Sequence, residues 1–446
     1  MTKEKYNAFP MNAQVNQSLR YSYYNGIFAS CMTGLTQEYL TPFLLLLNAA
    51  PKHVGFLNAF PNLFASLVQL KSAEVTEKLQ SRRKMVCFFV LLQALTLLLM
   101  SFMAFTGLKS PAIFITVVIL FSLFAAIHTP AWSSLMVDLV PEDKRGEYFG
   151  WRNRNLGFVV VGATLATGFI LQKMQMINVF YGFVIVFGLA FLCRITSWYF
   201  ITKMYEPPLT FAKEHYFSFF QFLARSKKSN FAKFVLFISM MSFSVNLAAP
   251  FFPVLMLQDL HFSYILYTVT NIFTTLALHL TMNRWGRHAD RMGNLKIIRL
   301  TAPLIGIIPL FWIINRQPIY LFFVQVFSGF LWSGFNLCSS NYIYDAVTAG
   351  KRTRCVAYFN VLNGMALSAG AVLGGYLVTK LPALFGYKIL TLFLISAILR
   401  IVVALIMPRK LKEVRAAVEK VSSNQLFFSM IGIKPVLGIE RKTIRF

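Results

Sequence analysis

Long apolar runs dominate the sequence, and short polar segments separate them. We distinguish twelve runs of about 20 residues, over 21–47, 54–70, 85–105, 113–135, 148–171, 179–201, 234–257, 264–282, 295–314, 319–340, 356–378 and 390–407. A helix of this length crosses the roughly 30 Å hydrocarbon core of a bilayer. Open sheets are excluded there, because backbone groups must be hydrogen-bonded within the segment. The pattern therefore predicts an all-α polytopic membrane protein with twelve transmembrane helices.

Charge refines this prediction. Only 13% of the 446 residues are charged, which is too few to cover a soluble protein of this size. A net charge of +27 could indicate nucleic-acid binding, but most of the 43 Lys and Arg lie at the termini and after every second run. The opposite connections hold six: Lys52, Lys109, Lys173, Arg316, Lys380 and Lys388. This asymmetry predicts cytoplasmic termini in the cell membrane, with basic residues facing the lipid bilayer and no nucleic acid.

The order of runs and linkers predicts five parts. They are a cytoplasmic segment (1–20), a six-helix bundle (21–203), a linker (204–233), a second six-helix bundle (234–408) and a cytoplasmic tail (409–446). Aromatic residues precede basic ones within the linker, which predicts an amphipathic helix on the membrane surface, with a plain flexible linker as the alternative. The start of the tail, 409–420, is basic and expected to be helical. The five cysteines lie singly without metal-ligand spacing, so we expect no metal. We also expect no cofactor and a monomer.

The two predicted bundles share an internal repeat. Asp138 and Asp345 align at an offset of 207, together with Lys144 and Lys351, Arg145 and Arg352, Asn153 and Asn360, Gly157 and Gly364, and Gly168 and Gly375. Pro42 aligns with Pro250 at an offset of 208, and Arg194 with Arg400 at 206. Parallel six-helix repeats predict two bundles related by an axis along the membrane normal, with a solute site between them.

A charged stretch at 283–294, expected to be a short loop between two helices, contains Gly286, Asp290, Arg291 and Gly293 in the spacing Gly-x-x-x-Asp-Arg-x-Gly. Glu77 and Lys78 occupy the corresponding positions of the first half, without the glycines. With Asp138, Pro141, Arg145 and Gly146 in the spacing Asp-x-x-Pro-x-x-x-Arg-Gly, the sequence resembles the major facilitator superfamily of transporters over about residues 20–408.

This resemblance implies alternating access and a charged cytoplasmic gate. The expected gate residues are Glu77, Lys78, Arg82, Asp138, Arg145, Asp290, Arg291, Asp345 and Arg352. A carboxylate is stabilised at a helix N-terminus, so Glu77 and Asp290 are expected to face helix starts in the opposite half. Lys78 and Arg82 can pair with Asp138, and Arg291 with Asp345, when the cytoplasmic side is closed. The alternative is that these charges only hold the loops inside.

Glu38 is the acidic residue that lies well inside an apolar run. An ionised acid there is costly, so it should be paired, hydrated or protonated. It shares its register with Asn246, and we expect it to couple protons or contact the substrate. The alternative is a structural acid that locks the first helix.

Weaker candidates for substrate or proton contacts are His128, Arg152, Arg154 and Asn336, each with a structural alternative. The arginines could attract an anion or could extend to the lipid headgroups, and Arg194 and Arg400 are interpreted as structural. The sequence thus predicts a secondary active transporter of a small solute, coupled to protons. Alternatives are an uncoupled facilitator, or a sensor or scramblase with the same fold. A membrane-embedded enzyme is disfavoured, because no catalytic or phosphate-binding motif occurs.

Overall fold

The computed structural model describes residues 13–69, 81–141, 145–207, 229–347 and 349–414, so the predicted amphipathic helix of the linker lies outside the described residues. Every described element other than turns is helical, apart from one isolated bridge between Leu384 and Tyr387. Ten of the described helical segments are long and apolar enough to span a membrane. The predicted all-α class is confirmed by these helices.

The chain forms two compact units. The predicted runs are found as helix over most of their described lengths, with breaks in the first and the seventh run. The first unit contains 1–213, 249–269 and 371–380, and the second contains 214–248, 270–370 and 381–446. The boundary therefore falls within two helices, and the predicted division into bundles at 204–233 stays a prediction.

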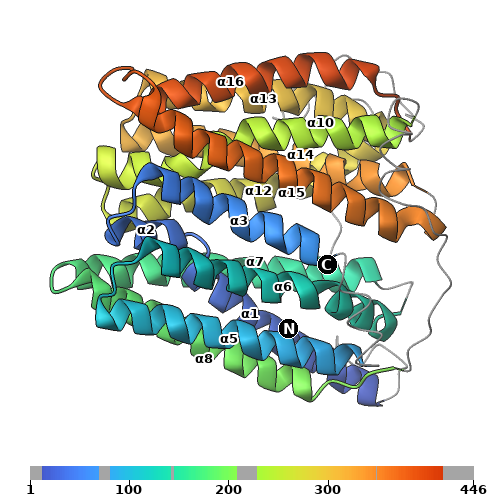
Figure 1. Cartoon of the computed structure of the whole chain (residues 1–446). Coiled ribbons are helices and arrows are strands. Elements are labelled where there is room, and N and C mark those ends of the chain that lie inside the picture. Colours follow the sequence, from blue (N-terminus) through green and yellow to red (C-terminus); the bar gives the residue numbers. More distant parts are fainter. Residues whose placement is uncertain (1–12, 70–80, 142–144, 208–228, 348, 415–446) are drawn as a thin grey trace. The chain divides into compact units, whose positions relative to one another are not determined.

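Among the described residues, seven helices form the body of the first unit. They are α1 (Ala13–Thr36), α2 (Leu40–Leu46), α3 (Pro51–Gln69), α5 (Arg82–Thr106), α6 (Pro111–Leu139), α7 (Arg145–Gln175) and α8 (Val179–Thr202). Figure 1 shows them as a bundle coloured from blue to green, in which α5 packs on both α6 and α8, and α1 on both α7 and α8. At three helix starts the side chain of Ser81, Ser110 or Asn178 accepts a backbone N–H of the first turn, as an N-cap does.

The seventh run is irregular. It contains α10 (Asn230–Asn246), η3 (Ala249–Phe251), the short α11 (Phe252–Val254) and the π-helical η4 (Leu255–Asp259). The remaining helices are α12 (Tyr264–Met292), α13 (Asn294–Ile314), α14 (Pro318–Asp345), α15 (Ala349–Lys380) and α16 (Lys388–Ile406), followed by η5 (Met407–Lys410). In the second unit, α13 packs on both α14 and α16, and α10 packs on α16.

Two local predictions were wrong. The charged stretch 283–294 is not a loop, because α12 continues to Met292 and the turn consists of Gly293 alone, at φ +86°. The polar residues are instead the last turns of a helix, and Trp285 among them is completely buried. The tail is not helical throughout its described part, because 411–414 follow η5 without helix and are held by hydrogen bonds to α10, α13 and α14.

Candidate functional site

The first apolar run is broken at the acidic residue. Glu38 lies in the turn between α1 and α2 and is half-buried. Pro42 is four residues further on and has no N–H, so it cannot donate the helical hydrogen bond that the Glu38 carbonyl would accept. The hydroxyl of Tyr267 in α12 donates to that carbonyl at 2.7 Å instead. Within the part of the chain that the structure describes, no ion pair or hydrogen bond is recorded for the Glu38 carboxylate.

The neighbouring tyrosine fixes the same turn. Tyr39 is completely buried, and its hydroxyl lies 2.7 Å from the carbonyl oxygen of Thr164 and 2.6 Å from the hydroxyl of Thr268. Gly168 of α7 makes room for this contact, since a Cβ added there would lie 2.5 Å from the Thr268 oxygen. The first turns of α12, which belong to the first unit, are thus hydrogen-bonded to the turn that carries the acid.

Asn246 lies at the equivalent break in the second unit. It is the last residue of α10, is half-buried, and donates to the Ser242 carbonyl at 2.9 Å. Pro250 follows it by four residues, as Pro42 follows Glu38. One proline in each half therefore interrupts the helix at the same register, and the break places a carboxylate in the first half and an amide in the second.

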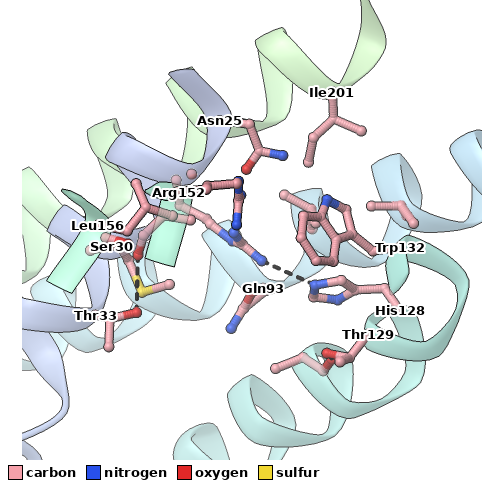
Figure 2. A pocket seen from close by; sticks show the side chains of 17 residues that line it. Asn25, Ser30, Thr33, Gln93, His128, Thr129, Trp132, Arg152, Leu156 and Ile201 are labelled. Atoms are coloured by element: carbon pink, nitrogen blue, oxygen red, sulfur yellow. Dashed lines mark hydrogen bonds between the residues drawn. The ribbon is translucent and has the colours of Figure 1, made fainter. Parts of the chain in front are cut away.

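A second polar feature lies wholly inside the first unit. Side chains from five helices, α1, α5, α6, α7 and α8, line a cavity of about 320 Å³ (Figure 2). Among its lining residues are three cationic or titratable side chains: His128, Arg152 and Arg194. None of the described residues that line it is acidic. Of the predicted candidates, the cavity therefore brings together His128 and Arg152, and it adds Arg194, which the sequence analysis interpreted as structural.

The side chain of Arg152, in α7, lies against α1 and lines the cavity. Its Nη2 donates to the Ser22 carbonyl at 3.2 Å, and its guanidinium lies 4.9 Å from the centre of the Trp132 ring. A Cβ added at Gly26 would lie 2.5 Å from Nη2, so the absence of a side chain at this glycine makes room for the guanidinium. Arg154, two residues further along α7, is exposed and does not line the cavity.

Asn336 of α14 is also exposed. The structure does not place it near another predicted candidate within its own unit, and its role stays a prediction.

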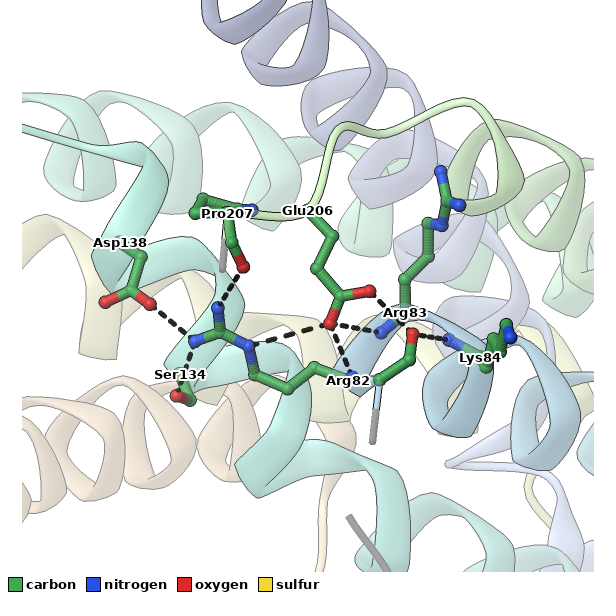
Figure 3. A network of polar contacts seen from close by, with 8 residues as sticks. Arg82, Arg83, Lys84, Ser134, Asp138, Glu206 and Pro207 are labelled. Atoms are coloured by element: carbon green, nitrogen blue, oxygen red, sulfur yellow. Dashed lines mark hydrogen bonds and ion pairs between the residues drawn. The ribbon is translucent and has the colours of Figure 1, made fainter. Parts of the chain in front are cut away.

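A polar network joins three helix ends of the first unit (Figure 3). Arg82, only 3% exposed, forms an ion pair with Asp138 at 2.5 Å. The carboxylate of Glu206, which follows α8, accepts from the Ser81 hydroxyl and the Arg82 backbone N–H, each at 2.6 Å, and from the Arg83 N–H at 3.3 Å. A carboxylate thus covers the N-terminus of α5, where the helix dipole favours negative charge.

The predicted Arg82–Asp138 pair is therefore present. Its geometry does not require a closed gate. Both residues belong to the first unit, so this pair holds α5 to α6 within one unit.

The second unit repeats this network with different residues. Glu413 accepts from the Leu295 backbone N–H at 2.7 Å and so covers the start of α13. Asp345 accepts from the Asn294 amide at 3.0 Å. Glu206 and Glu413 are 207 positions apart, the same offset as Asp138 and Asp345. Neither glutamate was predicted from the sequence, although their shared offset could have revealed them.

The other predicted gate residues are only partly described. Glu77 and Lys78 lie outside the described residues. Arg145 and Arg352 lie in the first turns of α7 and α15, and their side chains are likewise outside the described part. Asp290 is exposed near the end of α12 and is followed by Arg291. Their action as a gate stays a prediction.

The sequence matches a known family model, and the fold is similar to solved structures of transporters. The model of the Major Facilitator Superfamily matches residues 26–316 and 234–440. No curated protein sequence matches significantly. The nucleoside transporter NupG superposes with a TM-score of 0.69 at 14% identity, covering 88% of this chain and 99% of its own. A D-xylose–proton symporter gives 0.68 at 12% identity, covering 90% and 99%. A bacterial homolog of the human lysosomal transporter Spinster gives 0.60 at 13% identity, covering 89% and 97%.

Proposed function

Because the chain belongs to the Major Facilitator Superfamily, we propose that it is a secondary active transporter that moves a small solute across the cytoplasmic membrane by alternating access. Proton movement through Glu38 drives the solute. Both termini lie in the cytoplasm, on the side where most basic residues occur. The observation that carries the coupling proposal is the acid in a helix break, whose carboxylate has no recorded partner among the described residues.

A carboxyl group in this position suits proton exchange for a physical reason. Charge in the membrane interior is costly, so the ionised and protonated states differ in how much water and how many donors they need. A turn is easier to rearrange than a continuous helix, because fewer backbone hydrogen bonds oppose the change. The break created by Pro42 therefore gives Glu38 room to respond to its own protonation.

The hydrogen bonds at the break offer a path from protonation to movement. Tyr267 holds the backbone of Glu38, and Tyr39 next to it contacts Thr268. Any shift of the turn must change the contacts that it makes with the first turns of α12. A transport cycle needs such an element with two arrangements, and the bound proton would bias one of them.

We also propose that the charged ends of the helices act in the cytoplasmic gate. The networks at Glu206 and Glu413 hold the starts of α5 and α13 in place within their own units. Asp290 is exposed near the end of α12 with Arg291 beside it, and these two residues act in the gate itself. The fixed helix ends then serve as the rigid framework on which a gate can open and close.

Uptake into proteoliposomes tests the coupling. The purified chain is reconstituted with a pH-sensitive dye inside, and solutes that raise its melting temperature are added under an imposed pH gradient. We expect solute-dependent proton flux in the wild type and none in Glu38→Gln, while counterflow of solute persists. Asp259→Asn, a second carboxylate of the first unit at the end of η4, is the matched control and should retain flux.

Two results would separate the alternatives. Unchanged proton flux in Glu38→Gln would remove this residue from coupling. Solute movement down its gradient without proton flux, in the wild type, would favour an uncoupled facilitator. No solute movement with any compound would instead favour a sensor or a scramblase.

A further inference from the structure

The cavity inside the first unit concentrates positive charge. Arg152 is 6% exposed and Arg194 is 5% exposed, and both guanidinium groups line the same cavity of about 320 Å³. The described lining contains no carboxylate. Burying a guanidinium in a low-dielectric region is costly unless an anion compensates it. Two cations line this one cavity, and the neutral surroundings of Arg194 in particular favour an anion as its occupant.

The recorded partners of Arg194 are neutral. Its Nη1 donates to the Ser197 hydroxyl at 3.4 Å, and its Nη2 lies 3.3 Å from Nε2 of His128. Its buried Nε has no hydrogen-bond partner. The guanidinium of Arg194 therefore still has one N–H donor to offer, and its recorded partners do not balance its positive charge.

His128 cannot supply the missing negative charge, and its bonds show that it is neutral. Its Nδ1 lies 2.7 Å from the Phe124 carbonyl, which can only accept, so Nδ1 carries the proton. Nε2 is then an acceptor, as the contact with Arg194 requires. A second proton on this ring would set two donors against each other. The histidine therefore orients the guanidinium without balancing its charge.

Other donors line the same space. Ser197 donates to the Asn25 carbonyl oxygen at 3.0 Å, which leaves the NH₂ of that amide as a donor at the cavity wall. The indole Nε1 of Trp132 is buried and has no hydrogen-bond partner. The lining thus offers mainly donors, and an occupant rich in acceptor oxygens would match it.

We propose that this cavity is a binding site for an oxyanion, a small molecule bearing a carboxylate or phosphate group. Guanidinium groups bind such groups through two parallel hydrogen bonds, which a single spherical ion cannot accept. The volume lies in the range of small-molecule pockets. The proposal concerns a ligand site within one unit and does not depend on proton coupling at Glu38.

Binding of defined anions tests the proposal. The purified full chain is titrated with sodium phosphate or sodium succinate at constant sodium and ionic strength, balanced with sodium chloride, and binding is followed by calorimetry and melting temperature. A parallel titration uses micelles that contain phosphatidylglycerol, to distinguish a lipid headgroup from a soluble ligand. We expect saturable binding by the wild type, and at least tenfold weaker binding by Arg194→Gln and Arg152→Gln.

Arg154→Gln is the matched control, because this arginine lies two residues away on the same helix but is exposed. It should bind like the wild type. Gln93→Glu is a second, independent variant. Gln93 lines the cavity, is 2% exposed, and its Oε1 has no hydrogen-bond partner. A carboxylate there would supply the anion internally, so binding should be lost and the melting temperature should rise.

Each outcome of these titrations either supports or overturns the proposed oxyanion site. Binding of phosphate or succinate that is lost in Arg194→Gln and kept in Arg154→Gln supports a site for a soluble oxyanion. The same pattern with phosphatidylglycerol alone supports the site and assigns the ligand to a lipid headgroup. Equal binding by wild type and Arg194→Gln, or no binding of either source, overturns the proposal. Should Arg194→Gln fail to fold, wild-type binding by Gln93→Glu would overturn it.

Discussion

Replacement of Glu206 by glutamine should destabilise the protein, because this carboxylate covers the start of α5. Glutamine keeps one acceptor oxygen but removes the charge. The loss of the helix-dipole interaction costs about 0.3–1 kcal/mol. Hydrogen bonds to a charged group contribute about 1 kcal/mol more than neutral ones. This difference applies mainly to the bonds from Ser81 and Arg82, which are short at 2.6 Å. We therefore expect a loss of about 2 kcal/mol.

The measurement is a thermal melt in detergent followed with a thiol-reactive dye. Cys87, which lies in α5 of the same unit and is partly buried, becomes more accessible on unfolding. For a unit of about 200 residues, about 2 kcal/mol corresponds to a fall in melting temperature of roughly 4–8 °C.

Asp138→Asn is the matched control within the same network. Its side chain is 42% exposed, against 16% for Glu206, so solvent screens its ion pair with Arg82. The expected cost is below about 1 kcal/mol. A melting temperature unchanged by Glu206→Gln, or lowered more by Asp138→Asn, would refute the reasoning.

Three further results are expected. Asp290→Asn should increase labelling from the cytoplasmic side of a cysteine placed at Asn336, and unchanged labelling would count against the gate. Tyr267→Phe deletes the hydroxyl that supports the turn between α1 and α2, so proton-driven uptake should fall severalfold with a melting temperature lowered by a few degrees at most; wild-type uptake would contradict the proposed path. Gly168→Ala should cost about 1–3 kcal/mol, because the added Cβ would lie 2.5 Å from a threonine oxygen of α12. Gly162→Ala on the same helix meets open space and should be neutral or stabilising, and equal melting temperatures of the two variants would argue against that close contact.

The helices were predictable because membrane-spanning segments need long apolar runs, and the runs are found as helix apart from breaks in the first and the seventh. Their ends were not, because a helix can continue into polar residues beyond the membrane, as α12 does at Arg284 and Arg287. The breaks at Pro42 and Pro250 were not predicted, although a proline lacks the N–H that a continuous helix needs. The hydroxyl of Tyr267 that completes the first break comes from a residue more than 200 positions away and could not be read from the local sequence.

The candidate sites were predicted less completely. Glu38 stood out because an acid inside an apolar run is rare. Arg194 was interpreted as structural, because sequence position alone does not show that its guanidinium and that of Arg152 line one cavity. Glu206 and Glu413 were missed because each lies after the last helix of its repeat, where sequence patterns are weakest. Their function as caps depends on a contact with a distant helix start.

The two capping networks differ in one respect that affects how the protein responds to its surroundings. Arg82 pairs with Asp138 as an ion pair in the first half, whereas the amide of Asn294 meets Asp345 in the second. Dissolved ions screen attraction between opposite charges far more than a hydrogen bond to a neutral amide. A rise in ionic strength should therefore weaken the Arg82–Asp138 contact of the first unit more than the Asn294–Asp345 contact of the second, so that the two repeats depend unequally on salt.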